Sequence, residues 1–397
     1  MDWDYVNDWL AFLFRWLHVI AGIVWIGTSF YFVALDKHLR PPKGAEPGGD
    51  VAGETWEIHG GGFYRVEKFR VAPERLPEPL HWFKWEAYAT WLSGFALLVV
   101  LYYVDAEVYL IDRGVADLST VAAILISIGL LLAAVLVYEA LCRLLAGREL
   151  VLASAFLVAV TAAAWGVSNL FSGRGTYLQL GAMLGTIMAA NVLLVIIPGH
   201  WELVRAKQTG REPDPAPGLE GKRRSIHNTY LTLPVLLAMI SIHFPTAYAH
   251  EHGWAALVAL MAISAWVRHY FNLRHEGRTV WWIPATAALA VVALAVAIEP
   301  DEAGAPAAGS PPAFGQVRAI IATRCAECHS AAPTNGAFST PPAGVVLDTP
   351  EQIAAQADAI DEQAVRTRAM PLGNLTKMTD SERRVLAAWI EAGAPTR

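Results

Sequence analysis

The sequence has few charges and few cysteines for its length. Only 17% of its 397 residues are charged and three are cysteine, whereas 55% are hydrophobic. It contains no Walker loop, no dinucleotide-binding fingerprint and no internal repeat, so the common nucleotide-binding classes are excluded. The part from residue 299 onward holds 12 acidic and 8 basic residues. It therefore offers no basic surface for nucleic acid, which is not expected as a partner.

Charge is nearly absent from several stretches of about 20 residues, the length that a helix needs to cross about 30 Å of hydrocarbon. The sequence therefore predicts an all-α fold that begins with a polytopic, eight-helix transmembrane bundle in a lipid bilayer. The eight predicted spans are residues 9–35, 86–104, 120–142, 150–171, 177–197, 229–248, 254–273 and 280–298.

The basic residues predict how this bundle is oriented, because loops rich in Lys and Arg stay in the cytoplasm. The first, third, fifth and seventh loops, counted together with Arg268 near the end of the seventh span, hold 19 of them, and the second, fourth and sixth hold only Arg113 and Arg174. Both termini are therefore expected on the periplasmic side of a bacterial inner membrane. The N-terminus has Asp2 and Asp4 in place of the basic region of a cleavable signal peptide, so the first span is expected to stay in the membrane.

The most specific motif of the chain is Cys325-Ala326-Glu327-Cys328-His329. Two thiols at this spacing can hold a haem through thioether bonds, while the adjacent imidazole ligates the iron. A zinc site would need two further Cys or His ligands, and a thioredoxin-like site would need a βαβ setting that the sequence lacks. The motif therefore predicts one covalently attached c-type haem.

A methionine downstream of the motif is expected to be the sixth ligand of the iron. Met370 is the first candidate because it lies in a polar loop, between Ala369 and Pro371, and His/Met ligation raises the haem potential. Met378 is the reserve, and packing in a hydrophobic core is the ordinary alternative for either side chain. Beyond them a capping box predicts a helix from residue 380.

These features divide the chain into three parts. Residues 1–298 are predicted to form the eight-span catalytic domain, and residues 313–397 a small helical cytochrome c domain of the class I type. Between them lies a stretch rich in Pro, Ala and Gly, residues 299–312, which cannot bury a core and is expected to act as a tether. Cys142 has no thiol partner in the first part and is expected to pack as a small hydrophobic residue.

Polar side chains inside a bilayer are costly and often mark functional sites. His18 on the first predicted span and His243 on the sixth lie at comparable depth on the periplasmic side, as do Ser168 and Asn169. The two histidines are candidates to hold a shared ligand, such as the iron of an additional b-type haem. The ordinary structural alternative is that each histidine forms a hydrogen bond with a backbone carbonyl. On the cytoplasmic side the deepest polar residues are Glu86, Glu139 and Asn191.

Four segments, followed by the haem motif, resemble a known family. The segments are RWLHVIAG at residues 15–22, HGGGFY at 59–64, LHWFKWEAY at 80–88 and HNTYLTLP at 227–234. Together they are similar to the integral-membrane, cytochrome-c-fused bacterial urate oxidases, also called urate hydroxylases. The resemblance implies a role in purine catabolism, in which urate and water give 5-hydroxyisourate. It also implies that electrons pass to the fused cytochrome, and then to a terminal acceptor such as a cytochrome c oxidase.

Urate chemistry suggests roles for the polar residues. Urate is a planar anion at neutral pH, so it needs a cationic or N–H-donating cradle, partners for its ring edges, and a base. We expect Glu86 or a histidine to be the base, and Asn228 and Thr229 to bind the purine edges. His18 and His243 are then cofactor or relay groups on the haem side.

Two other functions remain open at this stage. The spans can belong to a b/c-type respiratory electron-transfer subunit that oxidises quinol and feeds the c-haem. A solute transporter with a regulatory cytochrome is the third class, which the fused redox carrier disfavours because it implies electron flow. Anaerobic reduction of the c-haem by urate, compared with quinol, separates the first two.

Overall fold

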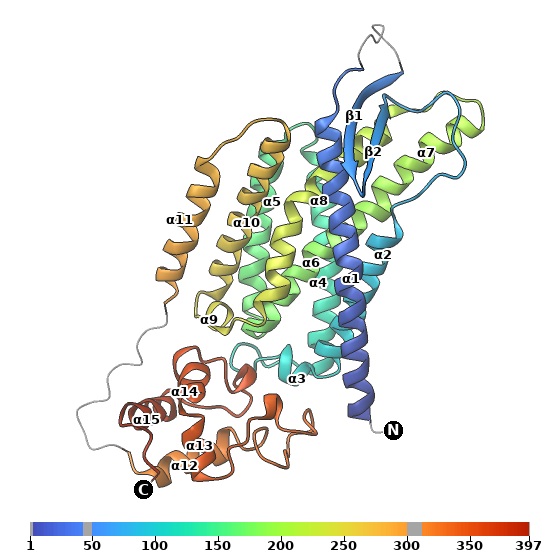
Figure 1. Cartoon of the computed structure of the whole chain (residues 1–397). Coiled ribbons are helices and arrows are strands. Elements are labelled where there is room, and N and C mark those ends of the chain that lie inside the picture. Colours follow the sequence, from blue (N-terminus) through green and yellow to red (C-terminus); the bar gives the residue numbers. More distant parts are fainter. Residues whose placement is uncertain (1–2, 43–49, 300–311, 397) are drawn as a thin grey trace.

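The computed structural model describes residues 3–42, 50–299 and 312–396, so nearly all of the predicted tether lies outside the described residues. It is mostly helical, with a bundle of long helices and a C-terminal domain beneath one end of it (Figure 1). The bundle helices are α1 (Trp3–His38), α2 (Trp85–Leu98), α3 (Ala106–Tyr109), α4 (Thr120–Leu144), α5 (Glu149–Ser168), α6 (Gly173–Asn191), α7 (Ile197–Gln208), α8 (Pro215–Ser241), α9 (Pro245–Tyr248), α10 (Gly253–His275) and α11 (Trp282–Ala297).

Short π-helical turns extend two of the bundle helices. The turn η1 (Val99–Tyr103) continues α2, and η2 (Val192–Ile196) joins α6 to α7. The C-terminal domain contains α12 (Phe314–Arg324), η3 (Pro342–Gly344), α13 (Pro350–Ala355), α14 (Ala357–Ile360), η4 (Asp361–Arg366), η5 (Leu372–Asn374) and α15 (Asp380–Glu391).

Six helices among the described residues are long and apolar enough to span a membrane. They are Tyr5–His38, Trp85–Tyr103, Thr120–Leu144, Glu149–Ser168, Gly173–Gln208 and Gly253–His275. Large apolar side chains such as Leu125 and Leu136 on α4 are more than 60% exposed on these helices. Apolar surface on this scale is compatible with a bilayer around the bundle.

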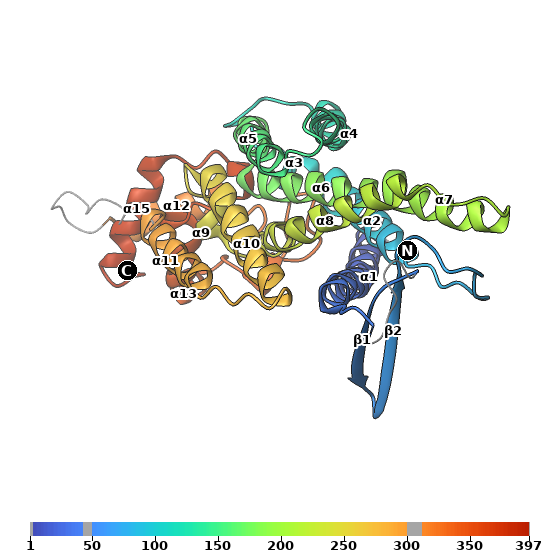
Figure 2. The same ribbon diagram turned by 90° about the horizontal axis from the view of Figure 1, so that it is seen from above.

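The two remaining predicted spans differ from the expectation. The predicted span 229–248 is interrupted, because α8 ends at Ser241 and the chain turns into the short helix α9. The predicted span 280–298 corresponds to α11, which has 16 residues. Seen from above, α8 lies between α6 and α10 (Figure 2), and it buries Asn228, Thr229 and Thr232 there. The full eight-span arrangement stays a prediction.

The loop between α1 and α2 corrects the all-α expectation. It forms an antiparallel hairpin of β1 (Val51–His59) and β2 (Gly62–Phe69). The turn is Gly60-Gly61, with φ of +56° and +83°, a conformation that suits a two-residue hairpin and that glycine adopts readily. The glycine run of HGGGFY is therefore a hairpin turn. The alternating residues on both sides of these glycines are the signal in the sequence that predicts such a hairpin.

Ion pairs connect the hairpin to the bundle. Asp36 near the end of α1 forms ion pairs with Lys68 of β2 and with Lys222 of α8, the latter at 2.6 Å. We call this end of the bundle the hairpin end, and the end that contacts the C-terminal domain the domain-facing end. The basic side chains Lys68 and Lys222 thus lie at the hairpin end.

The C-terminal domain has its own hydrophobic core. Val317 of α12 and Leu386 and Trp389 of α15 are fully buried in it. The helix α15 begins as predicted, with Thr379 and Glu382 forming a capping box. The domain meets the bundle where η5 contacts α3 (Figure 1). There Gly373 lies so close to the bundle that a Cβ atom would be 2.8 Å from the carbonyl oxygen of Ile111.

Candidate functional site

The haem-attachment motif lines a pocket that faces the bundle. The motif begins directly after α12, and its backbone folds into a turn in which the amide of His329 donates to the carbonyl of Cys325 at 2.9 Å. Both cysteines, His329 and the two candidate methionines line one pocket, the haem-motif pocket. Val108, from α3 of the bundle, contributes to the wall of the same pocket.

The chemistry of these groups fits a c-type haem. The Nδ1 atom of His329 lies 3.2 Å from the carbonyl oxygen of Val345, which fixes the ring and leaves Nε2 to act as a ligand when Nδ1 carries the proton. Cys325 and Cys328 form no disulfide. Burial raises the pKa of the Cys325 thiol to about 12, so it is neutral at physiological pH. The haem itself stays a prediction.

Met370 is held in a defined position beside this pocket. Its amide donates to the carbonyl of Gln363 at 2.8 Å, and its carbonyl accepts a hydrogen bond from Arg383 at 2.9 Å. Its side chain is partly buried, whereas Met378 is only 4% exposed and belongs to the hydrophobic core of the domain. This difference is what an axial ligand at Met370 and a core residue at Met378 would produce.

Replacing each methionine with alanine separates the two roles. We expect Met370→Ala to lower the reduction potential of the haem and alter its spectrum, because a thioether ligand raises the potential. We expect Met378→Ala to cost about 2–5 kcal/mol of stability, as for a buried methionine, with the spectrum preserved. Redox titration and denaturant unfolding measure the two effects, and the reverse pattern would make Met378 the ligand.

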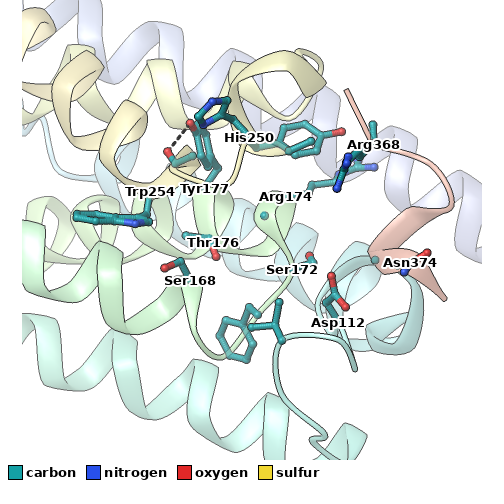
Figure 3. Close-up of a pocket in the computed structure, with 18 of the residues that line it drawn as sticks. Asp112, Ser168, Ser172, Arg174, Thr176, Tyr177, His250, Trp254, Arg368 and Asn374 are labelled. Carbon is teal, nitrogen blue, oxygen red and sulfur yellow. Dashed lines mark hydrogen bonds between the residues drawn. The ribbon is translucent and has the colours of Figure 1, made fainter. Parts of the chain in front are cut away.

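A second cavity, of about 370 Å³, lies next to the haem-motif pocket. We call it the interdomain cavity, because its walls come from the domain-facing end of the bundle and from loop 368–374 of the C-terminal domain (Figure 3). It shares Val108 and Leu372 with the haem-motif pocket. Ser168 and Asn169, which the sequence places on the periplasmic side, line it at the end of α5.

Cationic and unpaired polar groups line this cavity. Arg174, in the first turn of α6, donates from Nε to the hydroxyl of Tyr102 at 3.1 Å and lies 4.8 Å over the ring of Tyr109. No carboxylate of the described residues forms an ion pair with it. Thr176, two residues after Arg174 in α6, is 1% exposed, and its hydroxyl has no hydrogen-bond partner among the described residues.

Two carboxyl groups line the cavity, the half-buried Asp112 and the exposed Glu251. Burial raises the pKa of Asp112, although the amides of Gly114 and Val115 oppose this by favouring the charged form. A raised pKa shifts the group toward its neutral acid. The cavity therefore combines the guanidinium of Arg174 with two carboxyl groups, and the exposed one, Glu251, lies 3.5 Å from His252.

Asn228 and Thr229 lie in a different region, inside the bundle toward the hairpin end. The side chain of Asn228 accepts from Asn191 at 2.9 Å and donates to the carbonyl of Met188 at 3.0 Å. Thr229 donates to the carbonyl of Ile226 at 2.7 Å. Each predicted purine-binding group thus already has a partner within the protein.

Arg224 extends this group into a buried ionic network. It is 2% exposed and bonds Asn191 at 3.2 Å, Glu139 at 2.8 Å and Glu220 at 2.7 Å. Two of the deep polar residues of the sequence, Glu139 and Asn191, thereby find partners. These contacts give Asn228 a role in packing α8 against α6, and its catalytic role stays a prediction.

Glu86 is in the first turn of α2, also toward the hairpin end. Its Oε2 atom is buried and has no hydrogen-bond partner among the described residues. Among those residues, no hydrogen bond joins it to Asn228 or Thr229. Along α2 and η1 it lies roughly 24 Å from Tyr102, the residue that contacts Arg174 at the other end.

The two predicted histidines have different surroundings. His18 packs against Gly94 of α2, with Nδ1 at 2.9 Å from the carbonyl oxygen of Thr90 and 3.2 Å from the hydroxyl of Ser93. His243 is exposed just beyond the end of α8. His18 is thus hydrogen-bonded to the backbone, and a b-type haem shared with His243 stays a prediction.

The interdomain cavity is the part of the site that the sequence alone did not bring together. The bundle residues of its wall end at Trp254 and the C-terminal residues begin at Arg368, more than 100 residues later along the chain. One signal was present: Arg174 is one of only two basic residues in the loops that otherwise lack them. A lone basic residue in such a loop indicates the orientation of the bundle, and it is also a candidate to bind an anion.

Comparison with known proteins gives a match for the bundle only. A search of curated proteins and a search of solved structures gave no match. The family model described as urate oxidase N-terminal matches residues 4–299, which comprise the bundle and stop before the haem-attachment motif. Such a match indicates an oxidoreductase that acts on urate. Because this family model matches well over half of the chain, the chain belongs to the urate oxidase N-terminal family.

Proposed function

We propose that this chain oxidises urate to 5-hydroxyisourate in its membrane domain and passes the electrons to a c-type haem held by Cys325, Cys328 and His329. The family match over residues 4–299 supports urate as the substrate. The observation that carries the coupling is the position of the haem-motif pocket, whose wall includes Val108 of the bundle. A donor bound in this end of the bundle would be separated from the haem by little more than that wall.

The reaction balances with water as co-substrate. Urate loses two electrons, the oxygen of water bonds to C5 of the purine, and two protons leave. A bound haem would take the electrons one at a time and release them to a terminal acceptor such as a cytochrome c oxidase. The chain supplies a base for the protons, for which Glu86 or a histidine is the candidate. His329, fixed through Nδ1 on Val345, supplies a ring in a defined orientation.

The same proposal places the bundle in a bacterial inner membrane, with the C-terminal domain in the periplasm. The six apolar helices support the first part. The second is supported by the basic residues, since Lys68 and Lys222 lie at the hairpin end, away from the C-terminal domain.

Purified protein mixed with urate under nitrogen tests this function. We expect the reduced c-haem band to appear together with 5-hydroxyisourate, in a ratio of two electrons per urate. Quinol serves as the matched donor, and reduction by quinol with no response to urate would replace the proposal by the electron-transfer subunit. In intact spheroplasts, a membrane-impermeant oxidant such as ferricyanide should reoxidise the haem if the domain is periplasmic.

A further inference from the structure

We infer that the interdomain cavity binds the urate monoanion, so that the purine is held between the bundle and the C-terminal domain. This rests on the proposed function and assigns its substrate to a particular place. The predicted purine ligands Asn228 and Thr229 lie elsewhere, and their polar atoms already have partners. The cavity, by contrast, contains a buried hydroxyl, that of Thr176, which has no partner among the described residues.

The charge on the Arg174 side of the cavity matches an anion. Arg174 has no carboxylate partner among the described residues, and it lies in the first turn of α6, a helix of 19 residues. The N-terminus of a helix carries a partial positive charge that adds to that of the guanidinium. Figure 3 shows Arg368 of the C-terminal domain on the same side of the cavity as Arg174. Arg368 is ion-paired with Asp380, so Arg174 is the principal cation.

An independent observation points to a ligand. Thr176 is 1% exposed and lines the cavity, yet its hydroxyl finds no partner among the described residues. A buried hydroxyl without a partner costs free energy, which a bound polar group recovers. A purine oxyanion or ring N–H is a partner of the right kind, because a hydroxyl can donate or accept.

Shape and size agree with a flat heterocycle. The volume of about 370 Å³ lies within the range of about 300–1,000 Å³ that is usual for small-molecule sites. Tyr109, Tyr248 and Trp254 contribute aromatic rings to the walls. Aromatic walls suit a planar ring, since stacked and edge-on contacts both bury its faces.

The position of the cavity suits electron transfer. It shares Val108 and Leu372 with the haem-motif pocket, and Ala369 in its wall directly precedes Met370. The buried carboxyl of Glu86 lies roughly 24 Å along α2 from Tyr102, the partner of Arg174. Because electron transfer slows steeply with distance, a donor in the cavity would be better placed than one beside Glu86. Of the two candidate bases in the proposed function, Glu86 would then be too far from the purine, so the base would be a histidine, and His250 lines the cavity.

Binding measured without turnover tests the assignment. The full protein is kept under nitrogen with its haem fully reduced by dithionite, so that no acceptor remains, and radiolabelled urate is titrated by equilibrium dialysis. We expect Arg174→Gln to raise the Kd for urate roughly 10- to 100-fold, since a charge-assisted hydrogen bond is lost. Thr176→Val, which keeps the shape of the side chain, should raise it roughly 3- to 10-fold.

Matched variants control for charge and for the hydroxyl group. Arg113→Gln removes an exposed cation of the same end of the bundle that does not line the cavity, and Thr161→Val removes a hydroxyl that bonds Leu157 of its own helix. Both should bind urate like the unmodified protein. Arg174→Lys keeps the charge but lacks the planar guanidinium, so its Kd for urate should lie between those of the unmodified protein and Arg174→Gln. This variant tests the same contact if Arg174→Gln folds poorly.

The outcomes separate this inference from the proposed function. If urate reduces the haem of the unmodified protein while Arg174→Gln and Thr176→Val retain its Kd, urate binds elsewhere and the inference is wrong although the function stands. If the unmodified protein neither binds urate nor is reduced by it, the proposed function fails and the inference fails with it. Weaker binding in both variants, with the two control variants unchanged, supports the site.

Discussion

Replacing both Cys325 and Cys328 with serine is expected to abolish urate-dependent reduction of the chain and to leave no covalently bound haem. The thioether bonds need both sulfur atoms, and a serine hydroxyl does not form them. Without the haem the electrons have no acceptor on the chain, so the loss should be complete. Peroxidase staining of a denaturing gel measures covalent haem, and anaerobic mixing with urate measures the electron transfer.

The third cysteine provides the matched control. Cys142 is fully buried in the bundle, far in sequence from the motif, and Cys142→Ala should retain both the haem stain and the response to urate. His329→Ala adds a finer distinction, because it should keep the thioether-linked haem while removing the ligand that Val345 orients. A haem stain that persists in the double serine variant would contradict the attachment site.

Local patterns predicted much of this chain because their causes are local. Long runs without charge become helices wherever they occur, and six described helices are long and apolar enough to span a membrane. The capping box at Thr379 marks the start of α15 for a similar reason, since its hydrogen bonds connect residues three apart. The haem motif is likewise contained within five residues.

Burial could be predicted for the polar residues, but their partners could not. A polar residue deep in a predicted span, such as Asn191, is expected to face the interior of the bundle, and it is 3% exposed. Its partner depends on which helix packs against α6, and the structure brings Asn228 of α8 there. Helical periodicity gives the direction of a side chain and says nothing of the neighbour that it meets.

The interdomain cavity was the least predictable part. It forms where Arg174 and Thr176 of α6 approach loop 368–374, and this approach is set by how the C-terminal domain docks on α3. The hairpin of β1 and β2 was missed for another reason. Its signal, Gly60-Gly61 between alternating strand residues, was present in the sequence, and a search for strands in the loop would have found it.

Replacing Gly373 with alanine is expected to slow urate-driven reduction of the haem by about tenfold or more. Gly373 has φ of +54°, and an added Cβ would be 2.8 Å from the carbonyl oxygen of Ile111. The left-handed backbone costs alanine about 1–2 kcal/mol whether or not the domain is docked, whereas the crowding against Ile111, about 1–3 kcal/mol, arises only on docking. Because about 1.4 kcal/mol is a factor of ten, the docked arrangement of the C-terminal domain should be depopulated accordingly.

Stopped-flow absorbance at saturating urate measures this effect, since saturation removes any change in urate affinity. Direct reduction of the same haem by ascorbate should proceed at an unchanged rate, because the haem-motif pocket remains intact. Gly336→Ala is the matched control, as an added Cβ there meets nothing within 4 Å. If Gly373→Ala reduces its haem with urate as fast as the control does, the contact between η5 and α3 does not carry the electrons. If only the Gly373 variant is slow, and only with urate, then the docking of the C-terminal domain on α3 sets the rate at which electrons leave the bundle.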